Sequence, residues 1–306
     1  MVIKSSKSSK SSKSSQSAKA AKSSRPAAAG KAAKPTQAAS SNPVALITGA
    51  SSGIGEVLAR CFASAGHDVI LVARSSDKLK ALAQELESAH GIVALAQSAD
   101  LSVPGAAVKL FDALQARQRH VDVLVNCAGV LYQGSFLSID AAKHQQIIDL
   151  NVMGVTSMLS AFLPDMVARA DVDGPKRVLN VASIAAFQPI PALASYAASK
   201  AYVLSLSESL SEELKGTGVT VTALCPGITA TNMLTSAASA NDKVSRIPGF
   251  MVGDVNDVAH QGFEACMRGR AVCVPGAINQ ATTLATRASP KWLVRKLGGL
   301  LGRKAL

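Results

Sequence analysis

The sequence predicts a doubly wound α/β fold: one parallel sheet of about seven strands between two layers of helices, as a three-layer α/β/α sandwich in a single domain. Strand-like runs alternate with helix-like ones through the middle of the chain, and a glycine-rich turn joins the first strand to the first helix. Hydrophobic residues make up 48% of the 306 positions, which is enough for a substantial core.

The expected strands follow one another along the chain. They occupy residues 44–48, 67–73, 92–97, 122–126, 177–182, 218–224 and 271–274. The first intervening helix places apolar residues at helical spacing, so that one face can cover a sheet. These residues are Ile54, Val57, Leu58, Cys61, Phe62 and Ala65. A parallel sheet of this kind binds its ligand at the carboxyl ends of the strands.

The turn after the first strand reads Thr-Gly-Ala-Ser-Ser-Gly-Ile-Gly over residues 48–55. Gly49, Gly53 and Gly55 allow a tight turn and let a pyrophosphate approach the helix N-terminus, where free N–H groups and the helix dipole favour negative charge. The spacing differs from the Gly-x-Gly-x-x-Gly dinucleotide fingerprint. Taken alone, the turn is therefore a weak indication, about as consistent with a plain loop.

The end of the second strand bears on the choice of cofactor. An acidic residue here would hold a ribose 2′-hydroxyl, but the strand ends in Ala73 and Arg74. A guanidinium can form paired hydrogen bonds with a phosphate, so the sequence predicts NADP(H) in preference to NAD(H). The alternative is a solvated arginine at a turn, partly neutralised by Asp77.

Tyr196 and Lys200 lie four residues apart in a helix-like stretch, with Ser183 at the end of an earlier hydrophobic run. Residues at this spacing share one helix face, so the ammonium group can approach the phenol and favour its ionised form. Such pairs also occur by chance, as a half-buried tyrosine beside a solvated lysine. Because the chain also contains the glycine-rich turn, we interpret Ser183, Tyr196 and Lys200 as a site that transfers a proton to or from a carbonyl oxygen.

Together these residues resemble the short-chain dehydrogenase/reductase family over roughly residues 43–276. Three segments match motifs of the family: Thr48–Gly55, residues 126–129 after the fourth strand, and Pro226-Gly227-x-x-x-Thr231. Single residues match as well: Asp100 after the third strand, Asn151, Ser183, Tyr196 and Lys200. Cys127 departs from the second asparagine of the family's Asn-Asn-Ala-Gly motif, while Asn126 remains to brace the central sheet.

The resemblance implies a Rossmann-type fold and assigns functional residues. The implied catalytic residues are Asn151, Ser183, Tyr196 and Lys200. The implied cofactor contacts are Gly49, Ser51, Ser52, Gly53, Ile54, Gly55, Arg74, Asp100, Leu101, Asn126, Ala128, Gly129, Tyr196, Lys200, Pro226, Gly227, Thr229 and Thr231. Ser183 would polarise the substrate carbonyl and Tyr196 would protonate the alkoxide. Lys200 would lower the tyrosine pKa and hold the nicotinamide ribose, while Asn151 would hold a water.

The expected function is therefore an NADP(H)-dependent oxidoreductase that interconverts a carbonyl and an alcohol on a lipophilic small molecule. The alternatives are a non-catalytic NADP(H)-binding regulator and a basic-tailed interaction protein on the same scaffold. Apolar residues predict the substrate pocket, although they are equally consistent with ordinary core: Phe187, Ile190, Leu193, Met233 and Phe250. A mobile lid is expected over residues 232–253, where Lys243 and Arg246 could anchor an acid or remain solvated. We also expect a homo-oligomer, either a dimer or a tetramer.

The net charge of +12 belongs to the ends of the chain. Residues 1–42 contain nine Lys/Arg and residues 287–306 contain six, both without an acid, while the body between them carries seventeen against twenty acids, or −3. We expect 1–42 to be a disordered Lys/Ser/Ala-rich tail, since it lacks the apolar residues that would offset ordering entropy. It has no apolar core of a secretory signal. Three interpretations remain: a solvated tail, which we favour, a weak tether to polyanions or anionic surfaces, and a targeting extension. Specific nucleic-acid binding is not expected.

Beyond the domain at 43–276, residues 277–306 form a basic amphipathic extension. Within 290–301, Trp292 and several leucines and lysines could lie at a membrane interface. We favour packing of this segment on the domain or on a partner subunit, because Gly298 and Gly299 would weaken a free helix.

Cysteine and histidine usage excludes several classes of site. The five cysteines are scattered and mostly lie in apolar runs, which is typical of buried thiols in a reduced compartment. No Cys/His spacing predicts a metal site. No span looks long and apolar enough to cross a bilayer. We therefore expect a cytoplasmic protein, with the C-terminal segment as the candidate for peripheral membrane contact.

Overall fold

The computed structural model describes residues 42–229, 252–290, 292 and 296. All of them belong to one compact unit, Ser40–Leu306. Seven parallel strands form a single sheet in the order β3-β2-β1-β4-β5-β6-β7. Their bounds are β1 Val44–Thr48, β2 Asp68–Ala73, β3 Ala94–Ser98, β4 Val123–Asn126, β5 Lys176–Val181, β6 Val219–Leu224 and β7 Val272–Cys273. This confirms the predicted doubly wound parallel sheet.

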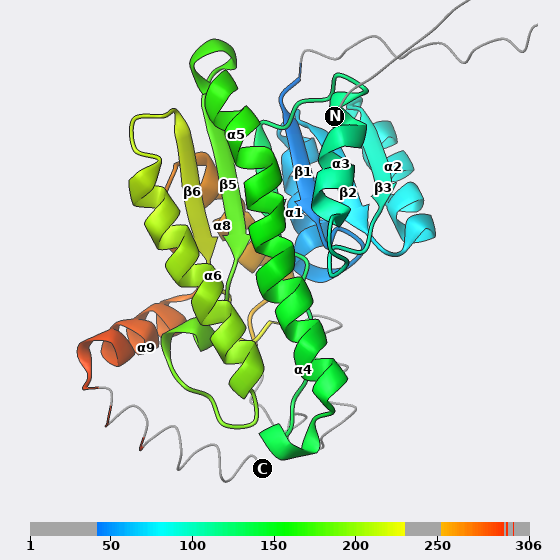
Figure 1. The fold of residues 1–306 in the computed structure, drawn as a ribbon. Coiled ribbons are helices and arrows are strands. Elements are labelled where there is room, and N and C mark those ends of the chain that lie inside the picture. The colour runs from blue at the N-terminus through cyan, green and yellow to red at the C-terminus, as the bar shows by residue number, and fades with distance from the viewer. Residues whose placement is uncertain (1–41, 230–251, 291, 293–295, 297–306) are drawn as a thin grey trace, which may run out of the picture. The chain divides into compact units, whose positions relative to one another are not determined.

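The helices cover both faces of this sheet (Figure 1). Their bounds are α1 Gly53–Ser64, α2 Ser76–His90, α3 Ala106–Gln115, α4 Ala141–Ile148, α5 Val155–Asp173, α6 Ala194–Glu213, α8 Val255–Met267 and α9 Ala277–Ala288. Short 3-10 turns lie at η1 Phe136–Ser138 and η3 Ile184–Phe187, and a π-helical turn, η2 Asp149–Gly154, joins α4 to α5. One core packs α3, α5 and α6 on the sheet, and the other packs α1, α2 and α8.

The order of the strands determines where a ligand can bind. The chain leaves β3 at one edge and returns as β4 beside β1, so that the crossovers on the two sides of β1 and β4 run in opposite directions. A crevice opens at such a switch point, at the carboxyl ends of the strands. β1 and β4 are in register from Ala45 opposite Val123 to Ile47 opposite Val125, which places the loops after both strands next to each other.

One expectation about hydropathy was wrong. Within the described residues, the continuous helical stretch Ala141–Asp173 is long and apolar enough to cross a membrane by length and composition alone. Its apolar character has a local cause, because Met158, Leu159 and Phe162 are buried against the sheet. We assign this stretch to the core of the domain.

Candidate active site

A cavity of about 660 Å³ opens at the carboxyl ends of the strands. It is lined by most of the residues that the sequence analysis assigned to cofactor and catalysis. These are Gly49, Ser51, Ser52, Gly53, Ile54, Gly55, Arg74, Asp100, Leu101, Ala128, Gly129, Ser183, Tyr196, Lys200, Pro226, Gly227 and Thr229. Asn126 and Asn151 are not among the lining residues, and Thr231 lies outside the described residues.

The glycine-rich turn has the backbone geometry that a phosphate cradle requires. Gly49 and Gly53 have positive φ angles of 69° and 59°, which side chains rarely adopt. A Cβ atom on Gly55 would lie 2.4 Å from the carbonyl oxygen of Gly49, so that only glycine fits there. α1 begins within this turn, and its first N–H groups are therefore available to an anion beside the cavity. The turn fits a dinucleotide pyrophosphate.

We expect Gly55→Ala to weaken cofactor binding and to destabilise the fold by about 1–3 kcal/mol, because the clashing atoms belong to the backbone of the turn. Gly253→Ala is the matched control, since its Cβ would meet nothing closer than 3.6 Å. Thermal unfolding and NADPH titration measure both effects. Equal NADPH affinity and equal stability of Gly55→Ala and Gly253→Ala would contradict the assignment of the turn to cofactor binding.

Thr48 ties this turn to the loop after β4. Its hydroxyl donates to the carbonyl oxygen of Val125 at 3.2 Å and accepts from the backbone N–H groups of Cys127 at 2.9 Å and Ala128 at 3.1 Å. The side chain is 1% exposed. Thr48 belongs to the predicted glycine-rich motif, but its role is not predictable from the sequence, since a hydroxyl that bridges two loops is recognisable only once their adjacency is known.

The loop after β4 is also held from the side of α5. Asn151, within the π-helical turn, accepts from the N–H of Val130 at 2.9 Å and donates to the carbonyl of Val130 at 2.9 Å and to the hydroxyl of Ser199 at 3.1 Å. Both donors of its amide are therefore engaged, which leaves one acceptor position for the predicted water. The structure gives this side chain a bracing role between the loop and α6.

Asn126 braces the sheet, as expected. Its amide donates to the side-chain oxygen of Asn180 at 2.9 Å, and Asn180 donates to the hydroxyl of Ser207 at 2.9 Å. This buried polar chain links β4 and β5 to α6, the helix that carries Tyr196. Its effect on the site is therefore indirect.

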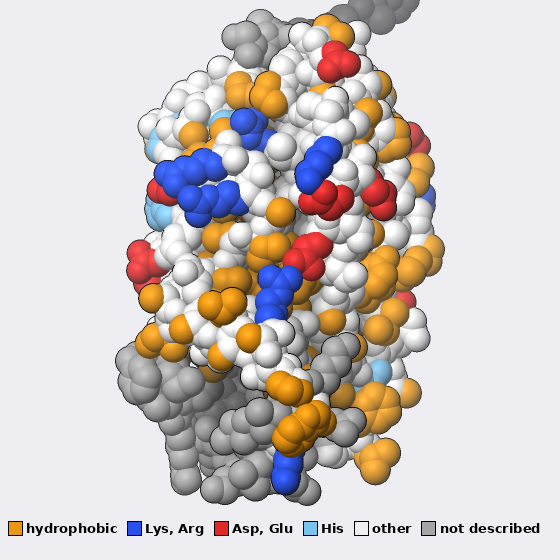
Figure 2. All heavy atoms as spheres, turned by 90° about the vertical axis from the view of Figure 1, so that its left-hand side faces the viewer, with side chains coloured by type: hydrophobic (Ala, Val, Ile, Leu, Met, Phe, Trp, Pro, Cys, Tyr) orange, Lys and Arg blue, Asp and Glu red, His pale blue; other side chains and the backbone are white. Residues whose placement is uncertain are grey.

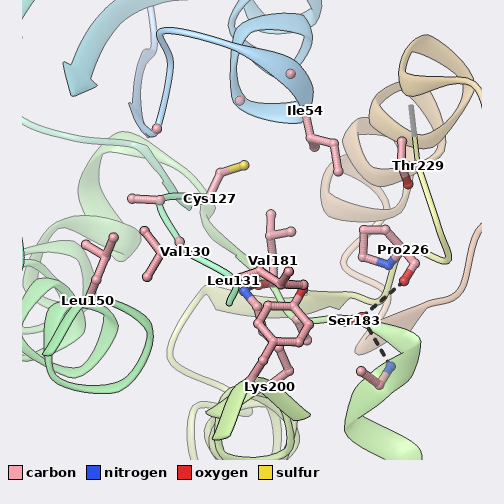
Figure 3. A pocket seen from close by; sticks show the side chains of 18 of the residues that line it. Ile54, Cys127, Val130, Leu131, Leu150, Val181, Ser183, Lys200, Pro226 and Thr229 are labelled. Atoms are coloured by element: carbon pink, nitrogen blue, oxygen red, sulfur yellow. Dashed lines mark hydrogen bonds between the residues drawn. The ribbon is translucent and has the colours of Figure 1, made fainter. Parts of the chain in front are cut away.

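Ser183 caps η3 at the end of β5. Its hydroxyl oxygen accepts from the N–H of Ala185 at 3.1 Å and lies 3.5 Å from the carbonyl oxygen of Pro226, to which it donates (Figure 3). The contact with Pro226 is at the long limit for a hydrogen bond, so the hydroxyl proton is weakly committed and can turn to a ligand. The strand end thus presents one donor to the cavity.

Tyr196 and Lys200 meet Ser183 in this cavity from α6. The Lys200 ammonium donates to the carbonyl of Val181 at 2.8 Å and lies 5.8 Å from the centroid of the Tyr196 ring. Burial lowers the pKa of Lys200 from 10.5 to about 8. The helical spacing in the sequence therefore brings the pair together as predicted.

The sequence predicts that Lys200 lowers the pKa of Tyr196, but in the structure the pKa of Tyr196 is raised. Burial raises the pKa of Tyr196 above its ordinary value, and the nearby Ser183 hydroxyl offsets that rise only in part. Lys200 is not among the groups that set this shift, and its ammonium donates to the Val181 carbonyl. The phenol is therefore in its protonated form at neutral pH.

Arg74 lies at the rim of the cavity beside Asp100. The Asp100 carboxylate accepts from the hydroxyl of Ser102 at 2.6 Å and from its N–H at 3.0 Å; these bonds, followed by the charge of Arg74, hold the pKa of Asp100 below its usual range. Asp100 therefore lies close enough to Arg74 for the charge of the guanidinium to act on its carboxylate. Among the described residues, no ion pair within 4.0 Å engages Arg74.

Part of the predicted substrate pocket lines the cavity. Ile190 and Leu193 do so, whereas Phe187 lies under the Arg287 guanidinium of α9 at 5.3 Å. Met233, Phe250, Lys243, Arg246 and most of the proposed lid lie outside the described residues. The cavity is also lined by residues that the sequence analysis missed, among them Val130, Leu131 and Gln133. Their position directly after the 126–129 motif was the available signal.

The described part of the chain also shows the state of the cysteines and of possible metal ligands. All five cysteines are free, and Cys127 lines the cavity with its thiol pKa raised by burial to about 11. No group of three or more His, Cys, Asp or Glu residues there could hold a metal ion.

Comparison with known proteins identifies the family. The short chain dehydrogenase model matches residues 43–242. The oxidoreductase UcpA of Escherichia coli K12 is 36% identical over 195 residues, which cover 63% of this chain and 72% of that protein. A short-chain dehydrogenase from Sphingobium yanoikuyae in complex with NADPH is 32% identical, with a TM-score of 0.69, and covers 81% of this chain and 96% of its own.

A short-chain dehydrogenase/reductase from Burkholderia phymatum in complex with NAD has a TM-score of 0.71 and 28% identity, and the match covers 79% of this chain and 92% of that one. The fold, the glycine-rich cradle and these relatives define a nicotinamide-dependent oxidoreductase. The chain belongs to the short-chain dehydrogenase family.

Proposed function

We propose that this protein uses NADP(H) to interconvert a carbonyl and an alcohol on a lipophilic small molecule, with Tyr196 as general acid and base. The observation that carries the proposal is the meeting of Ser183, Tyr196 and Lys200 in one cavity with the glycine-rich turn. These three groups combine a hydrogen-bond donor, a half-buried phenol and a cation at the place where a carbonyl oxygen would change its charge.

In the reducing direction, the Ser183 hydroxyl turns from its long contact with Pro226 and donates to the substrate oxygen. When bound, the nicotinamide would supply the hydride for the carbonyl carbon. Tyr196 then transfers its proton to the developing alkoxide, and the raised pKa of the phenol means that the proton is present at neutral pH. Lys200 holds the nicotinamide ribose and offers positive charge beside the phenol. Alcohol oxidation reverses these steps.

The preference for NADP(H) is supported by the chemistry at the end of β2. Ala73 offers no carboxylate to a ribose 2′-hydroxyl, and Arg74 lies at the cavity rim without an ion pair within 4.0 Å among the described residues. A 2′-phosphate would supply the anionic partner that this guanidinium lacks. The relatives include complexes with either cofactor, so the proposal depends on this residue.

We expect Arg74→Gln to lower kcat/KM for NADPH by about tenfold, because one charge-assisted hydrogen bond at a solvent-exposed site is lost. The value for NADH should change by less than about threefold. Steady-state kinetics with both cofactors measure the two ratios. A wild-type preference for NADH, or equal losses with both cofactors, would show that Arg74 does not bind a phosphate.

The lipophilic substrate is supported by the apolar part of the cavity lining. Val130, Leu131, Ile190 and Leu193 provide an apolar surface there. Substrates that bury an aliphatic chain against such a surface gain about 0.8 kcal/mol for each methylene group. Initial rates of NADPH consumption against ketones and aldehydes of increasing chain length, with and without a carboxylate, test this assignment. A rate that does not depend on chain length would contradict it.

A further inference from the structure

The proposed mechanism leaves two glutamine side chains of the cavity lining without a role. Gln133 follows β4 and Gln188 follows η3, and both are half-buried residues that line the cavity. Among the described residues, neither carboxamide has a hydrogen-bond partner. A carboxamide carries two donors and an acceptor oxygen, and water or a ligand must supply its hydrogen bonds where the protein does not.

The neighbours of Gln133 show which way its side chain is turned. Leu131 and Gln133 line the cavity, whereas Tyr132 between them does not. The Tyr132 hydroxyl donates to the side-chain oxygen of Gln146 on α4 at 2.5 Å, and the Lys143 ammonium lies 5.6 Å from the centroid of its ring. Such alternation is that of an extended chain, in which every second side chain lies on the same side. Gln133 therefore faces the cavity together with Leu131.

Gln188 is turned to the cavity in a similar way. Its backbone is extended, with φ −152° and ψ 151°, which is the conformation preferred before a proline. On either side of it, Phe187 lies under the Arg287 guanidinium of α9 and Pro189 is exposed, and neither lines the cavity. Gln188 and Ile190 both line it. The two residues therefore share the inner side of this segment.

Hydrogen bonds join the two segments that carry the glutamines. The N–H of Gly134 donates to the carbonyl of Ala192 at 3.0 Å. Ala192 has a φ of 68°, a left-handed conformation that is strained for alanine and is held by the surrounding structure. His144 of α4 joins the segments again, with Nδ1 2.7 Å from the Ser195 hydroxyl oxygen and Nε2 3.1 Å from the Phe136 carbonyl oxygen. Both glutamines therefore belong to one preorganised wall.

This wall offers polarity without charge. Three charged residues line the cavity within the described part of the chain: Arg74, Asp100 and Lys200. The first two follow β2 and β3, on the other side of β1 from the strands that lead into the wall, and the Lys200 ammonium donates to the Val181 carbonyl. On the outside of the domain, by contrast, Lys, Arg, Asp and Glu side chains lie at the surface (Figure 2). The wall therefore fits an uncharged polar group.

We infer that Gln133 and Gln188 bind a second, uncharged oxygen of the substrate, a hydroxyl or a carbonyl, so that the substrate is a lipophilic hydroxyketone or diketone. The subsite names the substrate class of the proposed function and rests on it: Ser183 and Tyr196 meet the reacting carbonyl, and the two carboxamides meet the other oxygen. A carboxamide suits both kinds of oxygen because it donates and accepts. A purely aliphatic chain would cover the two amides without replacing their hydrogen bonds to water, and would bind less tightly.

Calorimetric titration of the Tyr196→Phe protein, saturated with NADPH, measures ligand binding without turnover. The ligands are a straight-chain methyl ketone and its derivatives with a hydroxyl or a second keto group at successive carbons. We expect the best-placed oxygen to tighten binding by about tenfold, the effect of one or two neutral hydrogen bonds. A carboxylate at the same carbon should bring no such gain, because the described part of the wall carries no cation.

Adding Gln133→Leu or Gln188→Leu should reduce this gain to less than about threefold, since leucine has a similar size and no polar group. Gln84→Leu is the matched control and should keep the gain, because Gln84 is exposed on α2 and does not line the cavity. A full gain in either cavity variant, or no gain at any carbon in the parent protein, would overturn the subsite. Tighter binding of the carboxylate would overturn it as well.

NADPH consumption by the wild-type protein with the same ketones tests the proposed function separately. We expect the ketone that binds most tightly to have the highest kcat/KM. Turnover without a binding gain would overturn the subsite alone, whereas a binding gain without turnover would overturn the oxidoreductase activity that we propose.

Discussion

Tyr196→Phe should lower kcat by about 10²–10⁴-fold and leave the affinity for NADPH within about threefold of wild type. The variant removes one oxygen from a half-buried ring and keeps its shape, so the glycine-rich turn and Arg74 should still hold the cofactor. What is lost is the proton that the developing alkoxide takes. Stopped-flow measurement of NADPH oxidation and a fluorescence titration of cofactor binding separate the two effects.

The same helix offers a matched control. Tyr202 also lies on α6 and its hydroxyl contacts that of Thr156 at 2.8 Å, but it is 39% exposed and does not line the cavity. Tyr202→Phe should therefore keep the wild-type rate. A Tyr196→Phe protein with the rate of Tyr202→Phe would remove the phenol from the acid/base role.

The architecture was predictable because local signals and the global fold agree. Each expected strand falls within about two residues of an observed one, since buried parallel strands are continuous apolar runs bounded by turns. The close approach of Tyr196 and Lys200 was equally accessible, because helical spacing alone places them on one face. Gly55 was recognisable as part of a turn, although its contact with Gly49 was not.

The pKa shifts and hydrogen-bond partners of the site residues could not be predicted from the sequence. The influence of Lys200 on Tyr196 depends on where the ammonium points, and the Val181 carbonyl that accepts its hydrogen bond belongs to strand β5, not to helix α6. The amide of Asn151 is engaged by Val130, which lies 21 positions away in the chain. Such pairings follow from topology, so a sequence pattern identifies the residues but not their partners.

Lys200→Met should lower kcat by about 10²–10³-fold, as expected for the loss of one preorganised charge beside the reacting oxygen. Lys80→Met is the control, because Lys80 is an exposed lysine of α2. Retention of the wild-type rate by Lys200→Met would exclude the lysine from the mechanism.

The same variant should also change how stability depends on pH. Below pH 8 both the folded and the unfolded chain carry the Lys200 charge, and the folded protein bears the cost of burying it at 6% exposure. Between pH 8 and 10.5 the folded protein loses this proton while the unfolded chain keeps it, so the contribution of Lys200 to the unfolding free energy rises with pH across this window.

Methionine carries no charge and shows no such rise. The unfolding free energy of Lys200→Met minus that of wild type should therefore be largest below pH 8 and fall by about 3 kcal/mol as the pH approaches 10.5. Taking the difference cancels the titration of groups that Lys200 does not influence, such as Cys61 and Cys266. Burial raises the pKa values of Cys127 and Cys225 and the Lys200 charge lowers them in part, so these two thiols contribute to the difference. Denaturant unfolding at several pH values measures this difference in unfolding free energy.

A difference that stays constant with pH would mean that the Lys200 ammonium is not destabilised by burial. The lysine would then reside in this cavity without a thermodynamic penalty, and its presence would say nothing about function.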